Sequence, residues 1–338
     1  MVATGEVEET PKSFMCSSTG RRFFMQETTK REGTYMSFTG FSICVKSAIQ
    51  AKLGKDYKVK VEDDLLNNDV SVKRLSILKK GSNLATTIRL NNFYNRYRKG
   101  EELSVLEQQI LSAYEENRPP ECFQLDPVFI YDWNWIKGKI VFKLVNKEQN
   151  KEYLETIPFI EWNDLAIVFY CYFGIHNDSR ITIQLDWMHL VMWQKHLEDI
   201  WEEAKRNTPI LLPHRLVGFH EEVQRLKEFF GVQEDEDQEE WKHYPPMYII
   251  SNKNMMEGAG TILYDSVLKE LADKLDSDLI ILPSSINEVI IMKDEGFAVN
   301  EESFFNHMIQ QANEQVCKEE VLSNHYYKYV RSLDKVIY

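Results

Sequence analysis

Apolar residues return along this chain with two different periods, and the two periods separate predicted helices from predicted strands. From 41 to 53 they recur every three or four positions, which places them on one face of a helix, and Gly54 follows as a stop signal. Residues 181–186 instead alternate strictly between apolar and polar, as in a strand with one buried face. The chain therefore contains both kinds of element.

The same periods predict the remaining elements. Strands are predicted at 57–61, 70–78, 86–90, 139–145, 157–162, 165–173, 247–251, 258–263, 279–282 and 289–292, helices at 103–114, about 195–206, 266–275 and 303–314, and a closing hairpin at 326–331 and 335–338. Several of these strands follow one another too closely for a parallel crossover, which takes a dozen or more residues. We therefore expect an α+β fold in two parts, with largely antiparallel sheets and packed helices.

An acidic run marks the predicted boundary between the two parts. Residues 234–240 read EDEDQEE, with six acids in seven positions, and such a block repels itself and packs poorly. We expect a flexible leader at 1–35, an N-terminal α+β domain at 36–231, an acidic linker at 232–246 and a C-terminal α+β domain at 247–338. Met36 opens the first periodic stretch, so the native protein could begin there.

Composition and charge narrow the function classes. Hydrophobic residues make up 43% of the sequence, enough for a proper core, and the formal net charge is −13, which opposes binding to nucleic-acid phosphates. The longest apolar run, 165–173, is shorter than the roughly 20 residues that span a bilayer. Five scattered cysteines form no Cys-x-x-Cys pair, so we expect free thiols and a cytoplasmic protein.

Signatures of well-known active sites fail on inspection. There is no P-loop, and the glycine-rich 258–263 has leucine where a dinucleotide loop needs its third glycine. The zinc-protease pattern at 220–224 has Gln224 in place of the second histidine ligand. We therefore predict neither a metal nor a cofactor.

The loop 283–288 lies between two apolar runs and is the first candidate site. A hydrolase would use Ser284 or Ser285 as nucleophile, with Glu288 and His214 as acid–base partners. The alternative is a plain turn between two antiparallel strands, because Pro283 ends a strand and serine and asparagine favour turns.

A cluster of basic and aromatic residues at 89–99 is the second candidate. Aromatic rings can stack on bases while arginines pair with phosphates, so this cluster could bind single-stranded nucleic acid. The alternative is a short helix that places Phe93 and Tyr97 in the core, with Tyr94 and Arg98 stacked on each other. The residues of the nucleic-acid hypothesis are Arg89, Tyr94, Arg96 and Arg98.

Four segments together carry a family resemblance: GSNLATTIRLNNFYNRYRKGEEL at 81–103, KGKIVFKLVNKEQNKEYLETIPF at 137–159, TPILLPHRL at 208–216 and 247–291, which contains SDLIILPSSINEVII. From about residue 36 to the end, the chain resembles an uncharacterised family of cytoplasmic proteins from gut clostridia, a domain of unknown function. The resemblance implies no activity or cofactor, and it favours Met36 as the usual start. The family commonly has histidine where this chain has Asn287, which cannot titrate near neutral pH.

Together these patterns favour a non-catalytic cytoplasmic protein that acts through contacts with a protein partner, in an interaction or regulatory role. We expect no membrane contact and no nucleic-acid binding. A serine hydrolase and a single-strand binder remain the alternatives.

Overall fold

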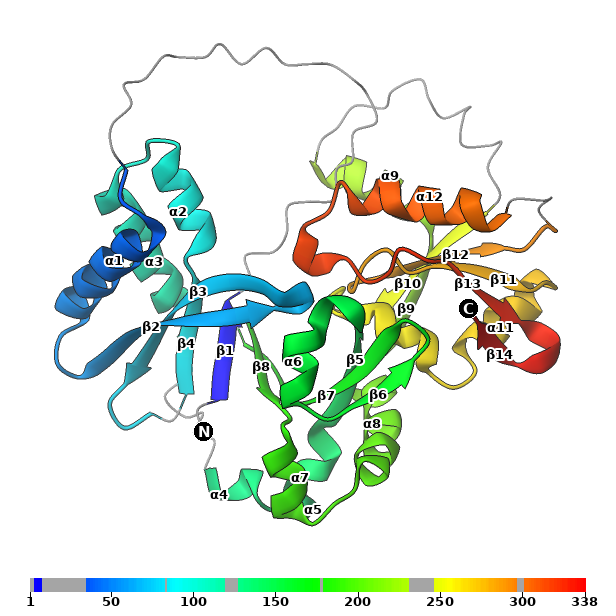
Figure 1. The fold of residues 1–338 in the computed structure, drawn as a ribbon, viewed down its shortest axis with the longest axis horizontal. Helices are drawn as coiled ribbons and strands as arrows, with labels where there is room; N and C mark the ends of the chain where they lie inside the picture. Colours follow the sequence, from blue (N-terminus) through cyan, green and yellow to red (C-terminus); the bar gives the residue numbers. More distant parts are fainter. Residues whose placement is uncertain are drawn as a thin grey trace, which may run out of the picture. The chain divides into compact units, whose positions relative to one another are not determined.

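The computed structural model describes residues 3–7, 35–82, 84–118, 127–176, 179–230, 246–296 and 301–338 (Figure 1). They form an α+β protein with largely antiparallel sheets, as the sequence predicted. The chain divides into two compact units. Unit 1 draws on Met1–Leu66, Ser71–Ile136 and Cys171–Ile183, and unit 2 on Asn67–Val70, Lys137–Tyr170 and Gln184–Tyr338.

This division differs from the predicted one. Strand β9 (His214–Gly218) precedes the acidic run, yet it pairs antiparallel with β10 (Met247–Asn252), which follows that run. Residues on both sides of 232–246 thus share one sheet in unit 2. Composition marks a break in regular structure but carries no information about which distant strands pair. Residues 232–245 of the predicted linker lie outside the described residues.

Unit 1 is a sheet with helices packed on one face (Figure 1). Its strand order is β2-β3-β4-β1-β8-β7, and β7 contributes only its second half. Within the predicted leader, β1 forms a strand parallel to β4, while 8–34 lie outside the described residues. The strands are β1 (Ala3–Val7), β2 (Tyr57–Leu66), β3 (Val70–Lys79), β4 (Leu84–Arg89), β7 (Leu165–His176) and β8 (Ser179–Gln184), and the helices are α1 (Phe38–Leu53), α2 (Asn91–Arg98), α3 (Leu103–Asn117), α4 (Pro127–Ile130) and α5 (Trp133–Ile136).

Helix α1 shows how the apolar period builds the core of unit 1. Phe41, Val45 and Ile49 are fully buried against the sheet and against α3. The Ser37 side chain accepts a hydrogen bond from the backbone N–H of Gly40 and so caps the first turn. Gly54 ends the helix at a φ of 83°, a value that residues with a Cβ rarely adopt. The predicted helix is confirmed, with its stop signal.

Unit 2 contains a six-stranded sheet of order β14-β13-β11-β12-β10-β9, together with β5, β6 and the first half of β7. Helix α12 packs through Phe305 and Ile309 against Ile280, Leu282 and Met292 on one face of the six-stranded sheet. The strands are β5 (Ile140–Asn146), β6 (Phe159–Trp162), β11 (Leu279–Leu282), β12 (Val289–Lys293), β13 (Tyr327–Val330) and β14 (Lys335–Ile337), and the helices are α6 (Lys151–Thr156), α7 (Trp187–Trp193), α8 (Leu197–Leu211), α9 (Phe219–Phe230), α11 (Val267–Leu275) and α12 (Glu301–Asn313).

One predicted element is wrong in type. Residues 258–263 were predicted as a strand, but Gly258–Leu263 form the 3₁₀-helix η4. The N–H groups of Gly258 and Ala259 donate to the carbonyls of Asn287 and Ile286, so this backbone is committed to a loop instead of a ladder. Short buried apolar runs look alike in both conformations. The closing hairpin, by contrast, is confirmed as antiparallel β13 and β14.

An asparagine network holds the last part of unit 2 in place. The turn residue Asn68 is buried and left-handed (φ 62°), and its side-chain amide donates to the carbonyls of Lys318 and Val321, both at 2.7 Å. The Asn68 backbone N–H donates to Oδ1 of Asn150 at 2.7 Å. Asn146 adds a bond of 2.9 Å to the carbonyl of Leu322. The segment 318–322 is therefore fixed by side chains far away in sequence.

No helix within the described ranges is both long and apolar enough to cross a membrane.

We predict that Asn68→Ala lowers the free energy of unfolding by about 2–4 kcal/mol, because the buried carbonyl of Val321 and the partly buried carbonyl of Lys318 lose their donor and a left-handed residue gains strain. Asn68→Gly tolerates the conformation and should cost less. The matched control is Asn163→Ala, at an exposed left-handed turn residue (φ 54°), with an expected cost of about 1 kcal/mol. Urea denaturation followed by tryptophan fluorescence measures all three, and equal losses at Asn68 and Asn163 would contradict a stabilising network.

Candidate functional site

The loop 283–288 connects antiparallel strands β11 and β12, and a second segment runs beside it. The backbone N–H of Ile286 donates to the carbonyl of Glu320 at 2.8 Å, and the backbone N–H of Leu322 donates to the carbonyl of Ser284 at 3.1 Å. Ser285 also forms a bridge with Val321. Since the asparagine network holds 318–322, it indirectly holds this loop as well.

Ser285 and Glu288 are brought together and buried, with exposed fractions of 5% and 7%. The Ser285 hydroxyl oxygen accepts the backbone N–H of Asn287 at 3.0 Å, which is a turn-forming bond. Burial raises the pKa of the Glu288 carboxyl to about 7; the hydrogen bond from Ser285 opposes this shift and the nearby Glu320 carboxylate adds to it. Glu288 is therefore protonated in part of the molecules at neutral pH.

The other two residues of the hydrolase hypothesis lie differently. Ser284 is half-buried, and its carbonyl accepts from Leu322. His214 is exposed at the start of β9, where it pairs in register with Asn252. Among the described residues, no contact joins His214 to Ser285 or Glu288. Ser285 and Glu288 therefore lie together, whereas His214 lies elsewhere in unit 2.

Asn287 anchors a neighbouring turn. Its side-chain oxygen accepts the backbone N–H of Glu257 at 3.0 Å, and its carbonyl accepts the N–H of Gly258 at 3.1 Å and the Ser251 hydroxyl at 2.6 Å. A Cβ on Gly258 would lie only 2.1 Å from the Ser251 hydroxyl oxygen, so this approach requires glycine. Asn287 thus positions Glu257.

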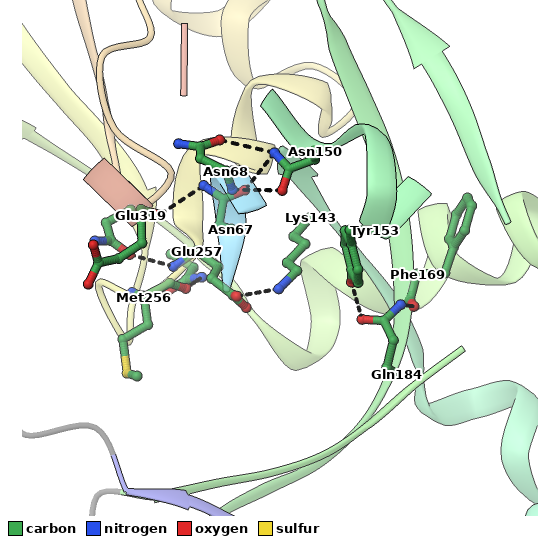
Figure 2. Close-up of polar contacts among 12 residues, drawn as sticks. Asn67, Asn68, Lys143, Asn150, Tyr153, Phe169, Gln184, Met256, Glu257 and Glu319 are labelled. Carbon is green, nitrogen blue, oxygen red and sulfur yellow. Dashed lines mark hydrogen bonds and ion pairs between the residues drawn. The ribbon is translucent and has the colours of Figure 1, made fainter. Parts of the chain in front are cut away.

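Glu257 faces a lysine that the sequence reasoning missed. The Lys143 ammonium lies 2.5 Å from a Glu257 carboxylate oxygen and 5.7 Å from the centre of the Tyr170 ring (Figure 2). Lys143 is the one residue of β5 that is not buried. The signal was present in the sequence: a single charge interrupts the apolar run IVFKLVN.

A second donor–acceptor pair comes from α6 and β8. The Tyr153 hydroxyl donates to Oε1 of Gln184 at 2.5 Å, and the Gln184 amide donates to the carbonyl of Phe169 at 2.8 Å. Figure 2 shows the Tyr153 hydroxyl pointing toward the Gln184 side chain. Tyr153 and Gln184 thus form a second polar pair of unit 2, besides the ion pair of Lys143 with Glu257.

The basic and aromatic cluster of unit 1 is mostly engaged in its own contacts. Tyr94 stacks on Phe38 with ring centres 4.7 Å apart, so the predicted stack of Tyr94 on Arg98 is replaced; Arg98 lies over Tyr35 instead. Arg96 forms two hydrogen bonds with Glu101, at 2.8 and 2.6 Å.

The other members of that cluster follow the helix alternative or lie on the sheet. Phe93 is buried and Tyr97 packs against the same core, as the helix alternative predicted. Arg89 lies on β4, in register with Arg74 of β3. Arg98 is exposed, whereas the Arg96 guanidinium donates to the Glu101 carboxylate. A nucleic-acid surface at 89–99 would therefore depend on fewer arginines than the sequence suggested.

Helix α7 presents an apolar surface. Trp187, Met188, Val191 and Met192 are between 44% and 71% exposed. We call these four residues the α7 face. The remaining apolar residues of the helix, Leu190 and Trp193, are buried, and Asp186 caps its first turn by accepting the N–H of His189 at 3.1 Å.

Fold and site together define an α+β protein with a buried acid, an ion pair of Lys143 with Glu257 and an exposed apolar helix. Comparison with known families identifies the family of the chain. The model of a family of unknown function, DUF5688, matches residues 38–331, so the chain belongs to this family. Searches of curated proteins and of solved structures gave no match.

We predict that the stability of the protein falls as pH rises through neutrality, in part because of Glu288. The pKa of Glu288 in the folded protein is about 7, above the ordinary value of 4.5. The stabilisation that this raised pKa gives is therefore fully present below pH 4.5 and is lost as the pH rises through 7. Glu288→Gln should flatten this slope and raise the free energy of unfolding at pH 8 by roughly 1–3 kcal/mol. Urea denaturation from pH 5 to 8 measures the slope, with Glu161→Gln, at an exposed position, as control. An unchanged slope in Glu288→Gln would exclude Glu288 as its source.

We further predict that a fluorophosphonate does not label Ser285 in the folded protein, because this hydroxyl is buried and takes part in a turn. Intact-mass analysis after reaction checks this. Labelling that disappears in Ser285→Ala, and persists in Ser284→Ala, would show instead that the loop carries a nucleophile.

Proposed function

We propose that this protein is a non-catalytic interaction protein of the bacterial cytoplasm that binds a partner protein through the α7 face. The observation that supports this role is the exposure of four large apolar side chains on one seven-residue helix. Exposed apolar residues are common singly, but a contiguous group is typical of a binding surface.

The structure of the helix suits this role. Leu190 and Trp193 are buried and Asp186 caps the first turn, so the helix is held while its other side remains exposed. Each large apolar side chain that becomes fully buried contributes about 1.5–3 kcal/mol. Methionine adapts its shape to a partner, and tryptophan is frequent among the residues that dominate binding energy. The four side chains together could therefore support a stable complex.

The net charge adds a property of the partner. At −13, the protein attracts basic surfaces and repels acidic ones. We expect a partner with an apolar patch and a basic rim, and an association rate that falls as salt concentration rises.

We predict that Met188→Glu with Val191→Glu abolishes partner capture. The double variant places two charges in the apolar contact, where each would have to be desolvated. The matched control is Ile43→Glu with Val105→Glu, which makes the same change at two exposed apolar positions of α1 and α3 in unit 1. Affinity capture from the native cell, with quantitative mass spectrometry, compares wild type, variant and control.

The proposal requires one species that wild type and control retain in a fixed ratio and the α7 variant loses. Equal retention by all three proteins would exclude the α7 face as the binding surface. Circular dichroism of each variant shows whether the fold is kept, and loss of capture by an unfolded variant would not count in its favour.

A further inference from the structure

Two methionines of helix α7 are open to solvent, unlike the others that the structure describes. Met188 is 59% exposed and Met192 is 44% exposed. They stand four positions apart, about one turn of the helix, and therefore lie on the same side of it. Within the described ranges the remaining methionines are buried or half-buried, and they are Met36, Met247, Met255, Met256, Met292 and Met308. An oxidant dissolved in water therefore has its easiest access to the two sulfur atoms of α7.

The methionines elsewhere in unit 2 are shielded by packing or by polar contacts. Met292 is buried in the cluster that helix α12 forms with the six-stranded sheet, and Met247 and Met308 pack against that cluster. The sulfur of Met255 accepts a hydrogen bond from the Arg215 guanidinium at 3.4 Å. At these positions the sulfur is covered or already in contact with a donor.

Exposed methionine has a defined chemistry with peroxides. The thioether sulfur attacks one oxygen of hydrogen peroxide, the S–O bond forms and the O–O bond breaks. The proton on the transferred oxygen passes to the departing hydroxide, which leaves as water. The sulfur loses two electrons and the peroxide gains two. Reductases return the sulfoxide to the thioether, with two thiols oxidised to a disulfide and the oxygen released as water.

From these positions we propose that Met188 and Met192 form a reversible oxidation site, at which peroxide switches off partner binding by the α7 face. The switch rests on the proposed function of this face, whereas the preferred oxidation of the two methionines does not. Met188 and Met192 are two of the four side chains of the face. Oxidation turns each of these flexible apolar side chains into a polar one, which must lose its hydration to enter an apolar contact.

The first measurement follows the oxidation of each methionine. The full chain is treated with hydrogen peroxide, catalase stops the reaction at intervals, and peptide mass spectrometry locates the added oxygen. Met188 and Met192 should gain oxygen before Met247, Met292 and Met308 do. Circular dichroism shows whether the treated protein keeps its fold. Oxidation of the α7 methionines at the same time as the others, or later, would overturn the proposal.

The second measurement compares partner capture by treated and untreated protein. Peroxide is removed before the protein meets a lysate freed of small thiols, so that this chain alone is oxidised. Capture should fall about 10-fold or more, because burial of a polar group without a partner is unfavourable. The two methionine sulfoxide reductases, one for each epimer, should restore capture when supplied with dithiothreitol. A fall that the reductases do not reverse would overturn the switch.

The matched variants remove sulfur from α7 or from elsewhere in unit 2. For Met188→Leu with Met192→Leu, capture after treatment is divided by the capture of the same untreated variant, and this ratio should stay near one. The control is Met247→Leu with Met308→Leu, on β10 and α12, whose ratio should fall as that of wild type does. An equal fall in the α7 variant and in wild type would overturn the switch.

Failure of the proposed function gives a different result. If untreated wild type retains no partner, the proposed function fails and the switch fails with it. The order of methionine oxidation is then still decided by the first measurement. If untreated wild type retains a partner and the treated protein retains as much, the proposed function stands and the oxidation switch is excluded.

Discussion

The packing of unit 2 depends on one turn residue. The Asn68 side-chain amide donates to the carbonyls of Lys318 and Val321, and its backbone N–H donates to Oδ1 of Asn150. The bonds to Val321 and Asn150 are buried, and the bond to Lys318 is partly buried. A buried polar group without a partner costs more than its hydrogen bond contributes, so these bonds form together or not at all. Only a residue that accepts a left-handed conformation and carries an amide meets both demands, which is why asparagine stands there.

Through backbone hydrogen bonds, the asparagine network also constrains the position of Glu257 beside Lys143. The segment 318–322 pairs with the loop 283–288, and Asn287 of that loop fixes the turn that places Glu257 against Lys143. The loop therefore has a positioning role, whatever chemistry its serines carry. The burial that holds the loop also raises the pKa of Glu288, because a carboxylate there would lose its hydration and meet Glu320. The stability of unit 2, the protonation of Glu288 and the position of Glu257 thus depend on the same contacts.

Sequence reasoning succeeded where local patterns decide the structure. Helix α1, the β11–β12 connection and the α+β class all follow from periods and turn residues. It failed where distant contacts decide. Helix α8 continues through Pro209 to Leu211, past the predicted end at about 206, and the Thr208 hydroxyl oxygen accepts the backbone N–H of Phe142, which ties this last turn to β5. Helices α6, α7 and α9 were missed, and η4 was assigned to the wrong class, since neighbouring layers decide which apolar residues are covered.

The same failure concerns two features of unit 2. Lys143 breaks a strand that is otherwise buried, and the α7 face exposes apolar residues on a helix that is otherwise anchored. Each departs from the rule that its element follows elsewhere, and departures of this kind are expected where function competes with folding. Neither can be recognised until the neighbours of each residue are known, because a lone lysine in an apolar run also occurs at an exposed strand edge. The burial of the neighbouring residues, which only the fold provides, distinguishes the two cases.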